Sequence, residues 1–273
     1  MNKHEWDSNT FEDIDWKCHG RALNRLDHHR TSLTKYLCNW HPVGKRVNKY
    51  HPKYPIACAS CGAPEENREH VLRCPKRQSE RTAWKKALKQ YTDKHNTHPM
   101  LQTLLLSALQ KVLDGEDTTG IEYDDSVADI ANAQAAIGWD QLLKGRLSKQ
   151  WAQRQDQHLK ECNLKTHRKN GQTWLTGIIQ ELLNQWFELW EARNHDRHGK
   201  DAQTKAQAAN QQVIHELQLL YDKYTGNLRT EQAWLLQTPI NTRSQWPTAS
   251  IRQWINTWEP VLEESYATQL ETG

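Results

Sequence analysis

The sequence predicts a mostly α-helical protein that contains one small irregular module. Nearly every segment with a readable apolar period repeats about every 3.6 residues, as an amphipathic helix does. Runs that alternate apolar and polar residues, which are typical of half-buried strands, are almost absent. The hydrophobic fraction is only 36%, but 13 Trp residues can still build a core because each aromatic side chain buries a large area. A chain of 273 residues is long enough for one or two domains.

The chain up to residue 226 is expected to divide into three parts. Residues 1–40 are expected to form a helical lead-in, and residues 41–95 a basic module followed by a helix. Residues 96–226 are expected to form a helical domain. Within that domain, Pro99 in a first turn and Gly115 after the last apolar position bound one helix.

A further helix is expected to begin at Ser126, because Ser126 and Asp129 have the spacing of a capping box. Gly138 is expected to end this helix. Trp151 and Leu159 are the expected anchors of the next one.

A long antiparallel helix hairpin is predicted from residue 173 onward. Its first helix carries a regular stripe made of Trp174, Ile178, Leu182, Trp186, Leu189, Trp190 and Arg193. Its second helix has Val213, Leu217, Leu220 and Tyr224 in step before Gly226. Two long helices joined by a short polar turn are typical of such a hairpin. Residues 227–273 are expected to form a helical tail, kinked or ended near Pro260.

Charge is nearly balanced over the whole chain, with 36 Lys and Arg against 33 Asp and Glu, but it is unevenly distributed. From residue 41 to 95 there are 13 basic and 5 acidic side chains. An acidic stretch follows at residues 114–130, and a second basic block, with 8 bases against 2 acids, spans residues 141–170. A basic block can be a solvated helix face or a surface for an acidic partner.

Four potential metal ligands lie in the first basic block, with the spacing Cys58-x2-Cys61-x8-His70-x3-Cys74. Two Cys separated by two residues can place both sulfurs on one ion, and a His and a Cys four residues apart share a helix face. Three thiolates and one imidazole form a closed tetrahedral set for a structural Zn²⁺. The sequence therefore predicts a CCHC zinc module, the alternative being small buried cysteines and a surface His.

Neither a signal peptide nor an apolar run of membrane-spanning length is found in the sequence. We therefore expect an intracellular protein, in the cytoplasm or the nucleus, without membrane contact. In that environment cysteines bind metal or pack as small apolar residues more often than they form disulfides. Cys18, Cys38 and Cys162 have no ligand partners in the sequence and are expected to pack in the core.

The segment CASCGAPEENREHVLRCP resembles the zinc-binding segment near the C-terminus of non-LTR retrotransposon reverse transcriptases. RTSLTKYLCNWHPVGKR resembles the basic lead-in of that region, and AIGWDQLLKGRLSKQW and LWEARNHDRHGKD resemble segments downstream of it. The resemblance covers most of residues 16–201. It implies a region that handles RNA or DNA and that works with the reverse transcriptase machinery of the element. It carries ligand roles only to Cys58, Cys61, His70 and Cys74.

The polymerase motifs of that family are missing. A polymerase palm needs Tyr-x-Asp-Asp on a β-hairpin, so that carboxylates can hold metal ions. In IEYDDSVADI, Tyr123 stands directly before Asp124, and the flanks are acidic. Strands that could carry an endonuclease or RNase H site are not predicted either. We therefore expect no enzymatic activity.

Backbone binding to RNA or DNA, without sequence preference, is the expected activity. Trp40 lies among basic residues and off any helical stripe, so it is the best candidate for stacking on a base, whereas Trp84, Trp151, Trp186 and Trp190 are expected in the core. The side chains expected to contact phosphates are Lys45, Arg46, Lys49, Lys53, Arg68, Arg73, Lys76 and Arg77.

Two alternatives remain open from the sequence. The chain could be a decayed remnant of a reverse transcriptase with a structural zinc only. It could also be a metal-dependent nuclease fragment that uses His195 and His198, which lie three residues apart. The simpler interpretation of these two histidines is a helix end, where basic side chains suit the negative end of the dipole and Gly199 provides the stop.

Overall fold

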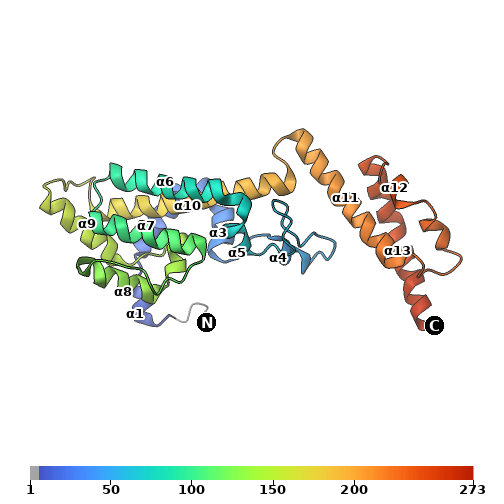
Figure 1. Ribbon diagram of the computed structural model, residues 1–273, viewed down its shortest axis with the longest axis horizontal. Helices are drawn as coiled ribbons and strands as arrows, with labels where there is room; N and C mark the ends of the chain where they lie inside the picture. The colour runs from blue at the N-terminus through green and yellow to red at the C-terminus, as the bar shows by residue number, and fades with distance from the viewer. Residues whose placement is uncertain (1–5, 273) are drawn as a thin grey trace. The chain divides into compact units, whose positions relative to one another are not determined.

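The computed structural model describes residues 6–272 and confirms the mostly α-helical fold (Figure 1). The α-helices are α1 Ser8–Asp13, α2 Trp16–Arg25, α3 Arg30–Leu37, α4 Gly44–Asn48, α5 Arg68–Arg73, α6 Gln78–Lys94, α7 Pro99–Asp114, α8 Ala128–Ile137, α9 Lys149–Glu161, α10 Gly171–His198, α11 Ala202–Tyr224, α12 Ile240–Arg243 and α13 Thr248–Thr272. Among the described residues no β-strand forms, and an isolated antiparallel bridge joins Ile14 and Ser148.

The chain divides into two compact units, each built from segments that are distant in sequence. Unit 1 consists of Met1–Pro42 and Arg68–Ala192, and unit 2 of Val43–Asn67 and Arg193–Gly273. Residues 1–5 of the predicted lead-in lie outside the described residues. None of the helices within residues 6–272 is both long and apolar enough to cross a membrane.

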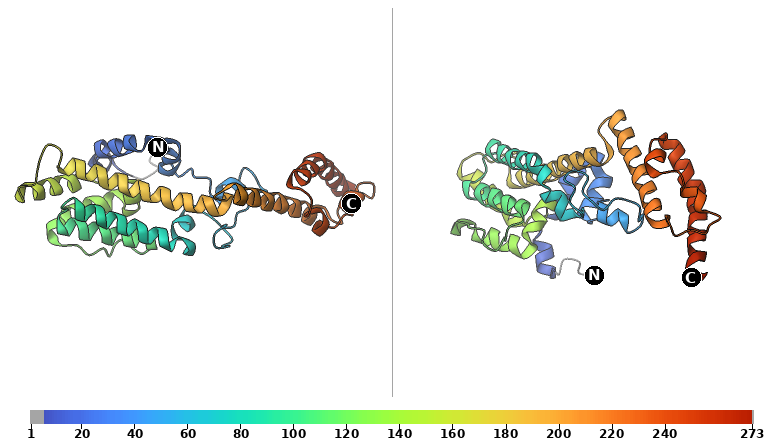
Figure 2. Two further views of the ribbon diagram at one scale, coloured as in Figure 1. Left: turned by 90° about the horizontal axis from the view of Figure 1, so that it is seen from above. Right: turned by 45° about the vertical axis from the view of Figure 1, so that its right-hand side comes forward.

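Unit 1 is organised around α10, which runs along α6 and α7 (Figures 1 and 2). The apolar stripe predicted for α10 is buried from Trp174 to Trp190. Tyr36 of α3 stacks on Trp186 with ring centroids 4.0 Å apart, and His41 packs against both Trp186 and Trp190. Aromatic pairs at these distances add to the stabilisation that burial provides.

The tryptophans expected in the core are found there. Trp84 and Trp151 are completely buried, and Trp186 and Trp190 nearly so. Large aromatic side chains on the inner helix faces therefore compensate for the low hydrophobic fraction of the sequence.

Several helix ends follow the local sequence. Helix α7 begins with Pro99, and Gly115 ends it in the left-handed conformation with φ 75°. This confirms the prediction, because only glycine adopts that conformation without steric cost.

The capping box predicted at Ser126 is wrong. A 3-10 turn, Asp125–Val127, precedes α8, and the side chain of Asp124 caps this turn by accepting from the backbone N–H of Ser126. An acidic residue two positions earlier thus takes the capping role. The structure has a full capping box elsewhere, at the start of α11, between Asp201 and Thr204.

In unit 2, α11 packs against α13. The shared core contains Val213, Leu217 and Leu220 from α11 and Ile251 and Ile255 from α13. Helix α13 is continuous through Pro260, so the expected ending of the helix at this residue is wrong. The two long helices predicted from residue 173 are present as α10 and α11, and Gly199–Asp201 separate them.

Candidate metal centre

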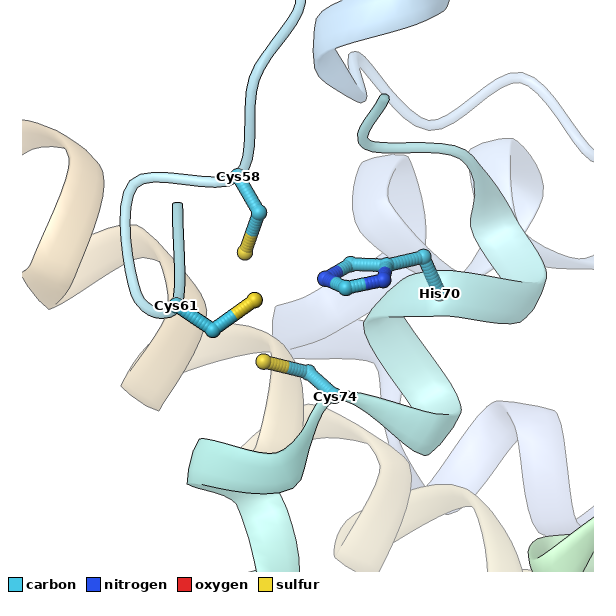
Figure 3. A group of neighbouring side chains, drawn as sticks. All are labelled: Cys58, Cys61, His70 and Cys74. Atoms are coloured by element: carbon cyan, nitrogen blue, oxygen red, sulfur yellow. The ribbon is translucent and has the colours of Figure 1, made fainter. Parts of the chain in front are cut away.

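The four predicted ligands come together (Figure 3). Their ligand atoms, one from each of Cys58, Cys61, His70 and Cys74, all lie within 4.8 Å of one another. In Figure 3 the three thiols and the imidazole ring point toward a common centre. Cys58 and Cys74 are buried, while Cys61 and His70 are half-buried.

A tight turn positions the first two cysteines. The backbone N–H of Gly62 donates to the carbonyl of Cys58 at 2.9 Å, and the N–H of Cys58 donates to the carbonyl of Ala63 at 2.8 Å. Gly62 has φ 75°, and no heavy atom lies near the position that a Cβ would take. Conformation, not lack of space, therefore requires glycine at this position.

Helix α5 and the residue after it supply the other two ligands. His70 lies within α5, and Cys74 follows its last residue, Arg73. The carbonyl of Cys74 accepts from the guanidinium of Arg81 at 3.0 Å and from the backbone N–H of Arg77 at 2.8 Å. Buried hydrogen bonds thus hold the backbone at Cys74 in place.

The chemistry of the donor set fits a metal ion. Three sulfurs and one ring nitrogen are the ligands that Zn²⁺ takes in closed structural sites. All six cysteines lie within the described residues, and none of them is in a disulfide. The residues present could therefore hold one tetrahedral metal ion.

A buried ion-pair network, which was not predicted from the sequence, lies next to the turn of residues 58–63, the cysteine loop. The carboxylate of Glu66 accepts from Nε of Arg193 at 2.9 Å and also from Nη2 of Arg193. It accepts further from Arg197 at 3.3 Å and from the backbone N–H of Gly44 at 2.7 Å. One signal was available, because Arg193 is a charged residue in the apolar stripe of α10, and such a residue needs a buried partner.

The network keeps Glu66 ionised. Burial by itself raises the pKa of the Glu66 carboxyl, but the hydrogen bonds and charge of Arg193, the N–H of Gly44 and the charge of Arg197 outweigh it. The resulting pKa lies below its usual value of 4.5. The same interactions raise the pKa of Arg193, against the effect of its own burial.

The basic residues predicted to contact phosphates differ in their accessibility. In unit 2, Lys45 and Lys49 are exposed, Arg46 is half-buried, and Lys53 is half-buried and paired with Glu259. Lys45 also forms a surface ion pair with Glu65 at 2.9 Å, which solvent weakens.

In unit 1, Arg73 and Lys76 are exposed beside Cys74, and Trp40 exposes 54% of its surface. Arg68 is half-buried and donates to Asn39. Arg77 is buried and donates to Glu80 at 3.0 Å, so the interface proposed below does not include it.

His195 and His198 occupy the last turn of α10, as the helix-end interpretation predicts. Gly199 follows with φ 84°, and its N–H donates to the carbonyl of His195 at 2.9 Å. Within residues 6–272, the Cys58–Cys74 cluster is the one place where three or more potential ligands meet closely enough to hold a metal ion. Neither histidine belongs to a group of three or more such ligands among these residues.

The remaining cysteines separate into different environments. Cys18 is buried, as predicted, and burial raises the pKa of its thiol to about 12. Cys38 is half-buried. Cys162 is exposed at the C-terminal end of α9, so its predicted packing role is wrong.

Comparison of the chain with protein-family models, with curated proteins and with solved structures found no match.

Proposed function

We propose that the chain is a retroelement-derived region in which Cys58, Cys61, His70 and Cys74 hold a structural Zn²⁺, and that the surrounding basic surface binds RNA or DNA. The observation that carries the proposal is the convergence of three thiol sulfurs and one imidazole nitrogen within 4.8 Å of one another. Thiolate-rich sets select zinc over the harder divalent cations. Since the four ligands fill a tetrahedron, the ion has no open position for catalysis.

The lack of regular structure around the first two ligands supports a structural role for the ion. Between Asn48, the end of α4, and Arg68, the start of α5, the chain forms only turns and irregular segments. Segments of this size rarely bury enough apolar area to fold alone. Metal binding would supply part of the stabilisation, because a site that forms only in the folded chain couples ligation to folding.

Exposed positive charge supports the choice of a nucleic acid as partner. Lys45 and Lys49 on one side of the cysteine loop in sequence, and Arg73 and Lys76 around Cys74, are all exposed. Contacts from lysine and arginine to phosphates position a protein on the nucleic acid without reading the base sequence. The proposed binding is therefore insensitive to sequence and sensitive to salt. The resemblance to non-LTR elements points to the same class of partner, RNA or DNA.

Fluorescence anisotropy with labelled RNA and DNA at several salt concentrations tests the proposal. We expect binding by the zinc-loaded protein that weakens as salt rises, with a slope that falls by about 0.7–0.9 for each phosphate contact removed. Lys49→Gln and Lys76→Gln change exposed side chains and leave the four ligands intact. Each substitution should therefore reduce the dependence of the affinity on salt. Lys86→Gln, an exposed position on α6, is the matched control and should leave the slope unchanged.

Three other results would contradict the proposal. Lack of binding at low salt would leave zinc with a structural role alone and favour the remnant interpretation. Binding that Lys49→Gln and Lys76→Gln do not change would move the activity to the second basic block, residues 141–170. Cleavage of the labelled strand in the presence of Mg²⁺ or Mn²⁺, abolished by His195→Ala, would support the nuclease alternative.

A further inference from the structure

A groove lies within unit 2, between the loop of residues 50–54 and one face of α11. Its volume is about 660 Å³, which is within the range of small-molecule and cofactor sites. The residues that matter for its chemistry are Tyr50, Tyr54, Arg197, Lys205, Ala208 and Ala209.

The spacing of residues on α11 explains why the groove is open. Lys205, Ala208, Ala209 and Gln212 line it, and these positions share one face of the helix. The two alanines in the middle leave room that larger side chains would fill. The apolar face of the same helix, which includes Val213 and Leu217, is buried against α13 instead.

The groove has an excess of positive charge. The carboxylate of Glu216, at one end, pairs with Arg252, and Lys53 pairs with Glu259. Glu66 is shared by two guanidiniums, so its single negative charge does not neutralise both Arg193 and Arg197. No ion-pair partner of Lys205 is found among residues 6–272.

Arg197 has a buried donor without an acceptor. Only 9% of its side chain is exposed, and its Nη2 donates to the carbonyl of Ala57 and to Glu66. Its Nε is buried and has no hydrogen-bond partner in the described structure. A buried donor in this state has a free-energy cost, which a hydrogen bond to an anionic oxygen would remove.

The groove also offers an aromatic face. Tyr50 exposes 70% of its surface, which is high for a large aromatic residue. Tyr54, the second tyrosine of the loop, lies 5.5 Å from the guanidinium carbon of Arg197, measured to the ring centroid. An exposed aromatic ring beside positive charge is the combination by which proteins bind unpaired nucleotides.

We propose that this groove binds an unpaired nucleotide of a single-stranded nucleic acid, with its base on Tyr50 and its phosphate at Lys205 and Arg197. This inference rests on the proposed function and deepens it, because it names single strands as the preferred partner. A paired base in a duplex stacks on its neighbours and has no face to offer to Tyr50. An acidic peptide would satisfy the positive charge but would leave Tyr50 without a stacking partner.

Anisotropy with a fluorescein-labelled single strand and the corresponding duplex, on the zinc-loaded full chain, tests the inference. Tyr50→Ala should weaken single-strand binding by about fivefold or more, the lower end of base–aromatic stacking, and leave duplex binding unchanged. Tyr50→Phe, which keeps the ring, should retain the affinity. Ala209→Leu should fill the groove and weaken single-strand binding, while Ala206→Leu, at an exposed position of α11 outside the groove, should not.

The outcomes separate this inference from the proposed function. Salt-sensitive binding that Lys49→Gln and Lys76→Gln weaken, but that Tyr50→Ala and Ala209→Leu do not change, would overturn the groove and leave the proposed function standing. Single-strand binding that depends on the groove variants alone would support the groove and overturn the role of the zinc module. Displacement of the strand by polyglutamate as effectively as by unlabelled strand would overturn the nucleotide assignment. No binding at all would overturn both proposals.

Discussion

Glu66 and Arg193 form a buried ion pair, although 127 positions separate them in the sequence. Their side chains are 1% and 2% exposed, so solvent does not screen the interaction. The carboxylate follows the cysteine loop, and the guanidinium belongs to α10. The pair thus attaches the irregular segment before α5 to a long helix, independently of any metal.

Replacement of Glu66 should be strongly destabilising. Glu66→Gln would leave Arg193 and Arg197 as buried charges without a counter-ion, which costs about 3–5 kcal/mol in comparable buried pairs. The free energy of unfolding measured in urea at neutral pH checks this expectation. Glu65→Gln is the matched control, because Glu65 is exposed and solvent weakens its pair with Lys45. Equal effects of the two substitutions would contradict a structural role for the buried pair.

The same pair should make stability depend on pH in the acid range. Because the folded protein holds the pKa of Glu66 below its usual value of 4.5, the unfolded chain binds a proton more readily than the folded one. The stabilisation from Glu66 is therefore fully present above that usual value and is lost as pH falls through the lower, folded pKa. Urea unfolding of the wild type and of Glu66→Gln at a series of acidic pH values measures this contribution to the free energy of unfolding. The difference in the free energy of unfolding between the two proteins should shrink as pH decreases. A difference that stays constant with pH would show that ionisation of Glu66 is not its cause.

Zinc should bind with a stoichiometry of about one ion per chain, as expected for a single closed site. Removal of the metal with a chelator should lower the unfolding temperature, since binding is coupled to folding. Cys58→Ser should lose the bound zinc, measured by metal analysis of the purified protein. Cys162→Ser, at an exposed cysteine outside the cluster, is the control and should keep it. Full zinc content in the Cys58→Ser protein would mean that the ion binds elsewhere.

Gly177, in the interior of α10, should not tolerate alanine. A Cβ at this position would lie 1.8 Å from the hydroxyl oxygen of Tyr91, which donates to the carbonyl of Trp174 at 3.1 Å. The clash should outweigh the gain in helix propensity and cost about 1–3 kcal/mol. Thermal unfolding of Gly177→Ala measures the cost. In Gly20→Ala, in α2, nothing lies near the new Cβ, so the substitution should be neutral or stabilise by up to about 1 kcal/mol.

Local features of the fold could be predicted from the sequence because they depend on neighbouring residues. The ligand spacing predicted the convergence of Cys58, Cys61, His70 and Cys74, since one tight turn and one helical turn bring them together. Pro99 and Gly115 likewise marked the ends of α7. The error at Ser126 has a local cause as well, because two potential caps, Asp124 and Ser126, compete within three residues.

Features that depend on long-range pairing could not be predicted. The apolar period of α10 included Arg193 but gave no indication of its partner among the acidic residues of the chain. Nor did the helical pattern of α11 show that Ala208 and Ala209 would line a groove beside Tyr50. Such placements depend on how segments distant in sequence pack, and a period along one helix carries no information about its neighbours.

The unequal exposure of the tryptophans gives the protein an optical reporter. Trp84 and Trp151 are shielded from water, whereas Trp40 is more than half exposed. Emission from the shielded indoles should be blue-shifted and resistant to a soluble quencher such as iodide, while Trp40 should emit at longer wavelength and be quenched. The exposed Trp234 and Trp246 also contribute to the quenchable fraction. A ligand that stacks on Trp40 would therefore change part of that fraction, and replacement of Trp40 by Phe would remove the effect of the ligand while the core emission persisted.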